Sequence, residues 1–263
     1  MNTKPFTVCS ASVLLLGLLF PAGCGKAAEG AGAPATPSAT RANPVVADPE
    51  TPPRARQSDL KALNAGACTQ SALVDDAEDG DNRVLIADKR GGYWYTYADT
   101  IGTTISPSGS FKMTEGGAEG SKYSARMTGK VATGGIVYAG MGFLFTEPKT
   151  PYDVSCCKGV SFWAKKSGTG TGNVRAKLGD VNTTPEGGVC HDCYNDFGAE
   201  LSFSDAWKKY ELSFADLKQE YGWGEPHPSL DTSRLYQVQW QVRDPGADFD
   251  ISVDKIELMG CEK

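Results

Sequence analysis

Short strand-like stretches, which recur from residue 72 onward, constrain the fold more than any other feature of the sequence. Each is six to ten residues long and is bounded by Gly, Pro, Asn or Asp. No window has a long helical period, so an all-β protein is predicted, either an antiparallel β-sandwich or a barrel. The predicted strands are residues 72–78, 92–99, 110–115, 122–128, 136–145, 159–166, 173–180, 207–214, 235–242 and 249–258, and one helical turn is expected at 215–220.

The first 23 residues have the pattern of a secretory signal. Lys4 is their only charged residue, and an apolar run extends from Ala11 to Phe20. This run has ten residues, which is too short to span a bilayer. Small residues precede Cys24, and this arrangement resembles the signal of bacterial lipoproteins, in which such a cysteine is lipidated. We therefore predict a signal peptide at 1–23 and lipidation at Cys24, with ordinary signal cleavage and release as the alternative.

Residues 24–66 are rich in proline and alanine and contain no aromatic residue. Such a segment buries too little apolar surface to offset its ordering entropy, so a disordered, partly extended linker is predicted. The remaining residues, 67–263, suffice for one domain with a substantial core. Together these segments predict an exported domain anchored in a membrane of the cell envelope, either at the outer membrane or at the cell surface.

The charge of the chain disfavours nucleic acid as a partner. The sequence has 26 basic and 32 acidic residues, a net charge of −6, and its basic residues form no cluster. Binding to phosphate backbones requires a basic patch or stripe, so we predict no nucleic-acid partner.

The cysteines of the exported domain predict disulfide bonds, since their number is even and the compartment is oxidising. Cys190 and Cys193 lie in a glycine-bounded loop and are predicted to staple it; a zinc site and a redox pair are the alternatives. Cys68 and Cys261 bracket the domain and are expected to pair if the terminal strands adjoin. The remaining predicted pair is Cys156–Cys157.

Four stretches resemble strands of bacterial exported domains with the galactose-binding-like jelly roll. They are VDDAEDGD (74–81), GVSFWAKK (159–166), AWKKYELSFADL (206–217) and DFDISVDKIEL (248–258). The characterised domains that the chain resembles are family 11 carbohydrate-binding modules, and the resemblance extends over about residues 70–260. It implies an antiparallel jelly-roll sandwich that binds a polysaccharide or oligosaccharide without catalysis.

The resemblance also implies a structural Ca²⁺ ion. Modules of this kind hold calcium with a first-strand glutamate, a last-strand aspartate and loop carbonyls. The matching residues are Glu78 and Asp254, with Asp76 and Asp250 as further candidates. Clusters of oxygen ligands select calcium, and a solvated acidic edge is the alternative. The apolar alternation of the last stretch changes phase, which predicts a bulge near Asp254.

Polar residues alternate with apolar ones in residues 173–180 and 235–242. If these strands lie side by side, their polar side chains form one face that suits sugar hydroxyls, and aromatic residues of nearby loops would border it. An ordinary solvated outer face is the alternative. The predicted ligand-binding residues are Arg175, Lys177, Gln237, Gln239 and Gln241 on the face, with Tyr194 and Trp223 in the loops.

Catalytic motifs are missing from the sequence. It has only two histidines and contains no GxSxG, Walker A or HExxH pattern. A pair of carboxylates for glycoside hydrolysis needs a defined separation, which a sequence does not give. We therefore predict a non-catalytic glycan-binding protein rather than an enzyme; a glycan-degrading enzyme and a structural envelope lipoprotein without a glycan ligand are the alternatives.

Overall fold

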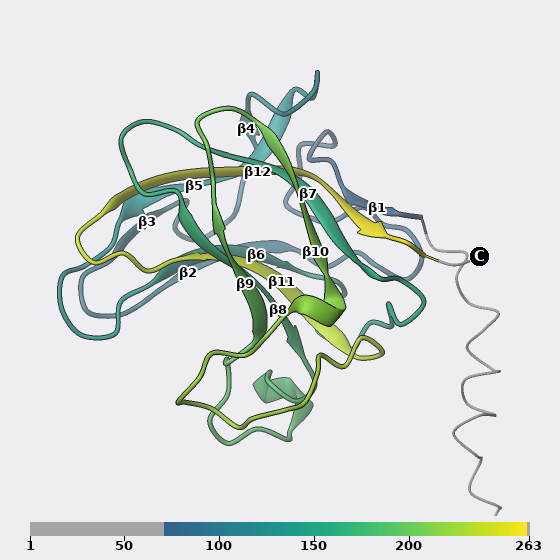
Figure 1. Cartoon of the computed structure of the whole chain (residues 1–263). Helices are drawn as coiled ribbons and strands as arrows, with labels where there is room; N and C mark the ends of the chain where they lie inside the picture. The colour runs from purple at the N-terminus through teal and green to yellow at the C-terminus, as the bar shows by residue number, and fades with distance from the viewer. Residues whose placement is uncertain (1–70, 262–263) are drawn as a thin grey trace, which may run out of the picture. The chain divides into compact units, whose positions relative to one another are not determined.

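A computed structural model describes residues 71–261 as two facing antiparallel β-sheets (Figure 1). The predicted signal peptide at 1–23, the predicted linker at 24–66, Cys24 and Cys68 lie outside the described residues. Within the described range, no helix is long and apolar enough to cross a membrane.

The first sheet contains seven strands. They are β1 (Leu73–Asp75), β3 (Thr104–Ser106), β4 (Thr114–Glu115), β5 (Tyr123–Lys130), β7 (Gly159–Lys166), β10 (Lys208–Ser213) and β12 (Asp248–Met259). Their order is β10-β7-β12-β5-β3, with β1 paired to β12 and β4 paired to β5. The first and last strands of the described chain are therefore neighbours. This is the arrangement on which the expected Cys68–Cys261 pairing depended.

The second sheet contains five strands. They are β2 (Trp94–Ala98), β6 (Ala139–Leu144), β8 (Asn173–Asp180), β9 (Phe197–Ser202) and β11 (Leu235–Val242). Their order is β2-β6-β11-β8-β9. Two short 3-10 turns, η1 (Pro185–Gly187) and η2 (Phe214–Asp216), are the helical elements of the described chain.

The hydrophobic core lies between the two sheets. Trp94 of β2 stacks on Trp240 of β11 with ring centroids 5.7 Å apart, and Phe162 of β7 meets Trp240 edge-on at 5.1 Å. All three side chains are less than 2% exposed. Alternate residues of β2, β8 and β11 point into this layer, and the residues between them point outward. The core thus determines which residues of the second sheet face away from it.

The alternation predicts three strands with their observed bounds, namely β7, β8 and β11. The expected turn at 215–220 is the shorter η2, and β3 and β9 were not predicted. In β9 the inward residues are Phe197, Ala199 and Leu201, but Gly198 between them weakens the alternation signal. The predicted bulge in β12 is confirmed, since the register shifts between Asp254 and Glu257.

Two of the three predicted disulfide pairings are wrong. Cys261 is bonded to Cys157, which excludes both Cys68–Cys261 and Cys156–Cys157. The reason is the sheet order: the end of β12 pairs with the start of β7, and the Lys158 N–H donates to the Met259 carbonyl. The third pair, Cys190–Cys193, is bonded as predicted, so neither sulfur is available as a zinc ligand.

Candidate functional site

The strand register defines the outward face of the second sheet. Gln239 of β11 lies opposite Lys177 of β8 on one side and Gly142 of β6 on the other, and Gly142 lies opposite Tyr95 of β2. The predicted polar residues of β8 and β11 therefore share one face. The next outward row contains Tyr97, Gly140, Gln241, Arg175 and Glu200.

Arg175 lies on this face but is covered. Its side chain donates to the backbone carbonyls of Asp196 (3.3 Å) and Lys218 (2.6 Å) and pairs with Glu200 (3.1 Å). The residue is 6% exposed. Arg175 thus anchors two loops over β8, and the expectation that it contributes to an open ligand floor is wrong, because loop backbone already occupies its donors.

Lys177 is covered in the same way and is also 6% exposed. Its Nζ lies 3.3 Å from the Asp196 carboxylate and 3.3 Å from the Tyr194 carbonyl oxygen. Burial raises the pKa of Asp196, and the ammonium of Lys177 opposes this rise by favouring the charged carboxylate. Lys177 and Asp196 form a buried ion pair, so the expectation of an exposed Lys177 is wrong as well.

Gln237 and Gln239 are buried beneath tyrosine side chains, whereas Gln241 is half-buried. The Tyr95 hydroxyl donates to Gln237 Oε1 (2.9 Å) and accepts from Gln239 Nε2 (2.7 Å). The Tyr97 hydroxyl donates to Gln239 Oε1 at 3.3 Å. These two glutamines were expected to be open to a ligand; in the structure they fix the phenol ends of two tyrosines.

Four tyrosines form a continuous line on this face, here called the tyrosine row: Tyr93, Tyr95, Tyr97 and Tyr138. Successive ring centroids are 6.5, 6.1 and 6.1 Å apart. Tyr93 is 37% exposed and the other three are half-buried. A Cβ at Gly140 would lie 2.4 Å from the Tyr97 ring, so this ring lies directly against the glycine backbone. The absence of a side chain there lets the tyrosine lie across β6.

Sequence reasoning missed the tyrosine row, although part of its signal is present. In GYWYTYAD the three tyrosines occupy the phase opposite to the core residue Trp94. In AGMGFL the glycines at 140 and 142 remove side chains from the same face. The two signals combine only when β2 and β6 are known to be neighbours, which the sequence does not reveal.

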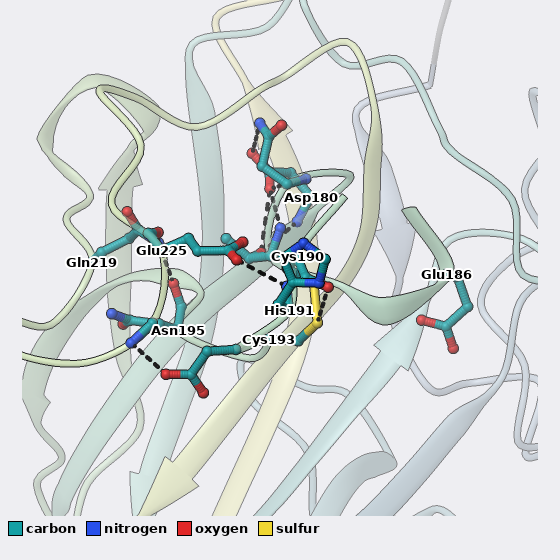
Figure 2. The surroundings of a disulfide bond; sticks show 12 residues. Asp180, Glu186, Cys190, His191, Cys193, Asn195, Gln219 and Glu225 are labelled. Atoms are coloured by element: carbon teal, nitrogen blue, oxygen red, sulfur yellow. Dashed lines mark hydrogen bonds between the residues drawn. A yellow bond between two sulfur atoms is a disulfide. The ribbon is translucent and has the colours of Figure 1, made fainter. Parts of the chain in front are cut away.

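Tyr194 and Trp223 lie on two loops that bind each other: the stapled loop, residues 190–196, and the tryptophan loop, residues 219–225. The Asn195 amide donates to the carbonyls of Glu220 (2.9 Å) and Trp223 (2.6 Å) and accepts from the Glu220 N–H. Figure 2 shows the staple and the Glu225 carboxylate that accepts from the His191 N–H at 3.0 Å. The loops therefore form one unit that carries three exposed aromatic side chains: Tyr194 is 55% exposed, Trp223 is 42% exposed, and Tyr221 is fully exposed.

An ion-pair cluster fixes the tryptophan loop to the sheet. Arg243, just beyond β11, pairs with Glu220 and, at 2.8 Å, with Glu200 of β9. Partial burial favours the neutral form of Glu220, but hydrogen bonds from Arg243 and the Trp223 side chain outweigh it and lower the pKa of Glu220. Trp223 thus hydrogen-bonds a carboxylate that Arg243, at the end of β11, holds in place.

Comparison with known proteins identifies the architecture. No protein-family model matches the chain, and no curated protein matches it. Among solved structures, a family 11 carbohydrate-binding module from Clostridium thermocellum, in complex with a β-1,3-1,4-mixed-linked tetrasaccharide, is similar with a TM-score of 0.53. The match covers 73% of this chain and 96% of that chain at 17% identity. The chain has a carbohydrate-binding-module fold. The predicted jelly-roll sandwich is therefore confirmed.

Two further solved structures are similar. A family 11 module of a cellulosomal cellulase of Clostridium thermocellum has a TM-score of 0.48 and 17% identity, over 64% of this chain and 87% of that chain. A family 30 carbohydrate-binding module has a TM-score of 0.47 and 11% identity, over 72% and 97% of the two chains.

Carboxyl groups on the outward face of this jelly roll are paired with cations. Glu200 contacts both Arg175 and Arg243, and the pKa of Glu220 is lowered. The pKa of Asp196 is raised by burial, but its side chain is enclosed against Lys177. A glycosidase needs a general acid with a raised pKa that reaches the substrate. None of Glu200, Glu220 and Asp196 has both properties.

The predicted calcium ligands Glu78 and Asp254 lie at one loop, residues 116–122. Glu78 accepts from the N–H groups of Lys122 (2.7 Å) and Tyr123 (2.9 Å), and the buried Asp254 accepts from Ala118 (2.7 Å). Their donor set fits part of a calcium shell, since Ca²⁺ takes six to eight oxygen ligands. The described residues contain no group of three or more acidic, histidine or cysteine side chains placed to hold a metal.

The other two predicted ligands are engaged elsewhere. Asp250 binds the Arg126 guanidinium with both oxygens, at 2.7 and 2.6 Å. Asp76 accepts from the N–H of Glu78 at 3.3 Å, an ordinary turn contact. Asp250 therefore already has a charge partner, and it is a poor candidate for a metal ligand.

Stability should decrease as pH rises from about 4 to 7 in calcium-depleted protein. Burial raises the pKa of Asp75, whose carboxylate accepts from Trp94 Nε1 at 2.5 Å, to about 7, and it raises the pKa of Asp254 to about 6. An unfolded aspartate has a pKa of about 3.9, so the unfolded chain holds fewer protons than the folded one in this window. The stabilisation that each aspartate contributes is present in full below its pKa in the unfolded chain. It is lost as pH rises through its pKa in the folded protein.

Differential scanning calorimetry at pH 5 and pH 7.5 tests this expectation, with Asp75→Asn as the control. The wild type should show a larger drop in melting temperature between the two pH values than the variant, because the amide does not titrate. Equal drops in the two proteins would show that Asp75 is not the buried acid described above.

Proposed function

We propose that this protein binds glycans without catalysis, through the tyrosine row on the outward face of the second sheet. The observation that carries the proposal is the line of partly exposed tyrosine rings, in which Tyr97 lies across Gly140, where a surface side chain would normally project. Aromatic faces stack on the apolar C–H face of a sugar ring, and fixed hydroxyl and amide groups bond its hydroxyls.

The polar groups of this face support the same proposal. The hydroxyls of Tyr95 and Tyr97 are held by Gln237 and Gln239, so a ligand meets an arrangement that is already ordered. Preorganised contacts reduce the entropy that binding must offset. The half-buried Gln241 extends the polar groups of this face toward Arg243, which pairs with Glu220 of the tryptophan loop. The similar family 11 module, which was solved with a mixed-linked tetrasaccharide, makes glycans the first ligands to test.

Tyr97→Ala should weaken glycan binding by roughly 10- to 100-fold, which corresponds to about 1.4–2.8 kcal/mol. The matched control is Tyr123→Ala, which removes a half-buried tyrosine from β5 of the first sheet. A glycan array selects the ligand, and calorimetric titration then compares the variants. Equal affinity of Tyr97→Ala and wild type would place binding elsewhere. Silence of the whole array would favour a structural lipoprotein, and release of shortened glycan would favour an enzyme.

The proposal places this domain at the cell envelope. The signal-like residues 1–23, Cys24 and the proline-rich segment 24–66 support it through their sequence alone. A lipid at Cys24 and an extended linker would hold the glycan-binding face away from a membrane. Detergent partitioning of bacterially expressed protein tests the anchor. The wild type should enter the detergent phase and Cys24→Ala the aqueous phase; identical partitioning would rule lipidation out.

The proposal also includes a structural Ca²⁺ ion between Glu78 and Asp254. The buried Asp254 carboxylate, whose pKa burial raises to about 6, supports it because a cation there would offset the cost of ionising this group. Carbonyl groups and water would complete the shell. Calcium that binds only the folded state should raise the melting temperature of chelator-treated protein. Titration without any such shift at pH 7.5 would refute the calcium site.

A further inference from the structure

Tyr194 has a backbone conformation that L-residues rarely adopt. Its φ is +76°, in the left-handed region that favours glycine. Its N–H donates to the Thr183 carbonyl at 2.7 Å, and its own carbonyl accepts from Lys177 Nζ at 3.3 Å. The ring, in contrast, is 55% exposed. The fold therefore fixes the backbone in an unfavourable state and gains little burial of the aromatic ring in return.

The residues on both sides of Tyr194 hold it in place. Cys193 before it is bonded to Cys190, and Asn195 after it binds the tryptophan loop with both ends of its amide. Figure 2 shows these two residues on adjoining parts of the same loop. Asp196, next along the chain, forms the buried ion pair with Lys177. Several independent contacts thus fix the segment of backbone that carries one exposed aromatic side chain.

The Tyr194 backbone lies over the face of the second sheet that carries the tyrosine row. Lys177, which holds the Tyr194 carbonyl, lies opposite Gln239, whose amide bonds Tyr95. Partial burial and the negative charges of Glu186 and Asp196 raise the pKa of Tyr194, and the phenol of Tyr138 adds to the rise.

We propose that Tyr194 is a preorganised ligand-binding residue that closes over a sugar lying on the tyrosine row. Lys177, Asp196 and the Cys190–Cys193 staple act as positioning residues for it. This inference rests on the proposed function. Backbone strain kept at an exposed residue is typical of binding sites, where the surrounding structure enforces a conformation that folding alone would not favour. The same arrangement explains why the stapled loop covers β8 but leaves the tyrosine row partly open.

Tyr194→Gly separates binding from folding, because glycine adopts a positive φ without steric cost. The variant should keep or raise the melting temperature while its affinity falls at least roughly tenfold. Tyr194→Phe keeps the ring and should keep most of the affinity. The probe is the β-1,3-1,4-mixed-linked tetrasaccharide, or the tightest ligand found on a glycan array. A melting temperature several degrees lower in Tyr194→Gly would show that the ring serves packing, and would overturn the inference.

The outcomes distinguish this inference from the proposed function. If the wild type binds no glycan, both fail. If Tyr97→Ala loses affinity and Tyr194→Gly does not, the face binds glycans but Tyr194 is not part of the site. If both variants lose affinity, the inference is supported.

A double-mutant cycle tests the positioning role of the staple. Cys190→Ser with Cys193→Ser should weaken binding in the wild-type background and leave the residual affinity of Tyr194→Gly unchanged, because the staple then has no ring to direct. Equal losses in both backgrounds would show that the staple acts only on the stability of the loop.

Discussion

Lys177→Met should lower the free energy of unfolding by roughly 3–5 kcal/mol, because it leaves the Asp196 carboxylate buried without its charge partner. Asp196 is 1% exposed, and Lys177 lies 3.3 Å from it under the stapled loop. The matched control is Lys209→Met. Lys209 pairs with Glu257 at 3.0 Å, but both side chains are 40% exposed, so its loss should cost less than about 1 kcal/mol.

Urea denaturation of the two variants measures this difference. The double variant Lys177→Met, Asp196→Leu should recover much of the lost stability, since it removes both charges from the interior. If Lys177→Met is no more destabilising than Lys209→Met, Lys177 is solvated, and the sequence-based interpretation of an open polar floor would be restored.

Removal of the Cys157–Cys261 bond should cost about 4–5 kcal/mol, the stabilisation that the chain-entropy model gives for a closed loop of about 100 residues. The two cysteines are 104 positions apart, and their bond joins the start of β7 to the end of β12. Cys190→Ala with Cys193→Ala opens a loop of only three positions and should cost about 2 kcal/mol in the same model.

Guanidinium denaturation of the two alanine pairs compares these costs. Cys157→Ala with Cys261→Ala should lower the free energy of unfolding clearly more than Cys190→Ala with Cys193→Ala. A smaller effect than that of the Cys190 and Cys193 pair would contradict the assignment of Cys261 to Cys157.

The jelly-roll fold was predictable because its signal is local. Alternation within β8 and β11 assigns each residue to the inward or outward side, and the structure retains this assignment. The phase change in the last stretch likewise predicts the bulge at Asp254. These patterns depend only on neighbouring residues in one strand. They therefore do not depend on contacts with distant parts of the chain.

The exposure of the predicted site residues was not predictable in the same way. Arg175 and Lys177 do point outward, but loops around residues 194–196 and 218–220 cover them. Whether an outward residue meets solvent or a loop depends on tertiary contacts that no strand pattern encodes. The pairing of Cys261 failed for the same reason, since it depends on which strand ends lie together.

Amide chemical-shift mapping with the best array glycan tests the central claim most directly, because it locates the ligand without a substitution. We expect the largest shifts in β2, around Tyr138, and at Tyr194, with little change in β5 of the opposite sheet. Shifts centred on β5, with β2 and Tyr138 unaffected, would contradict the assignment of glycan binding to the tyrosine row.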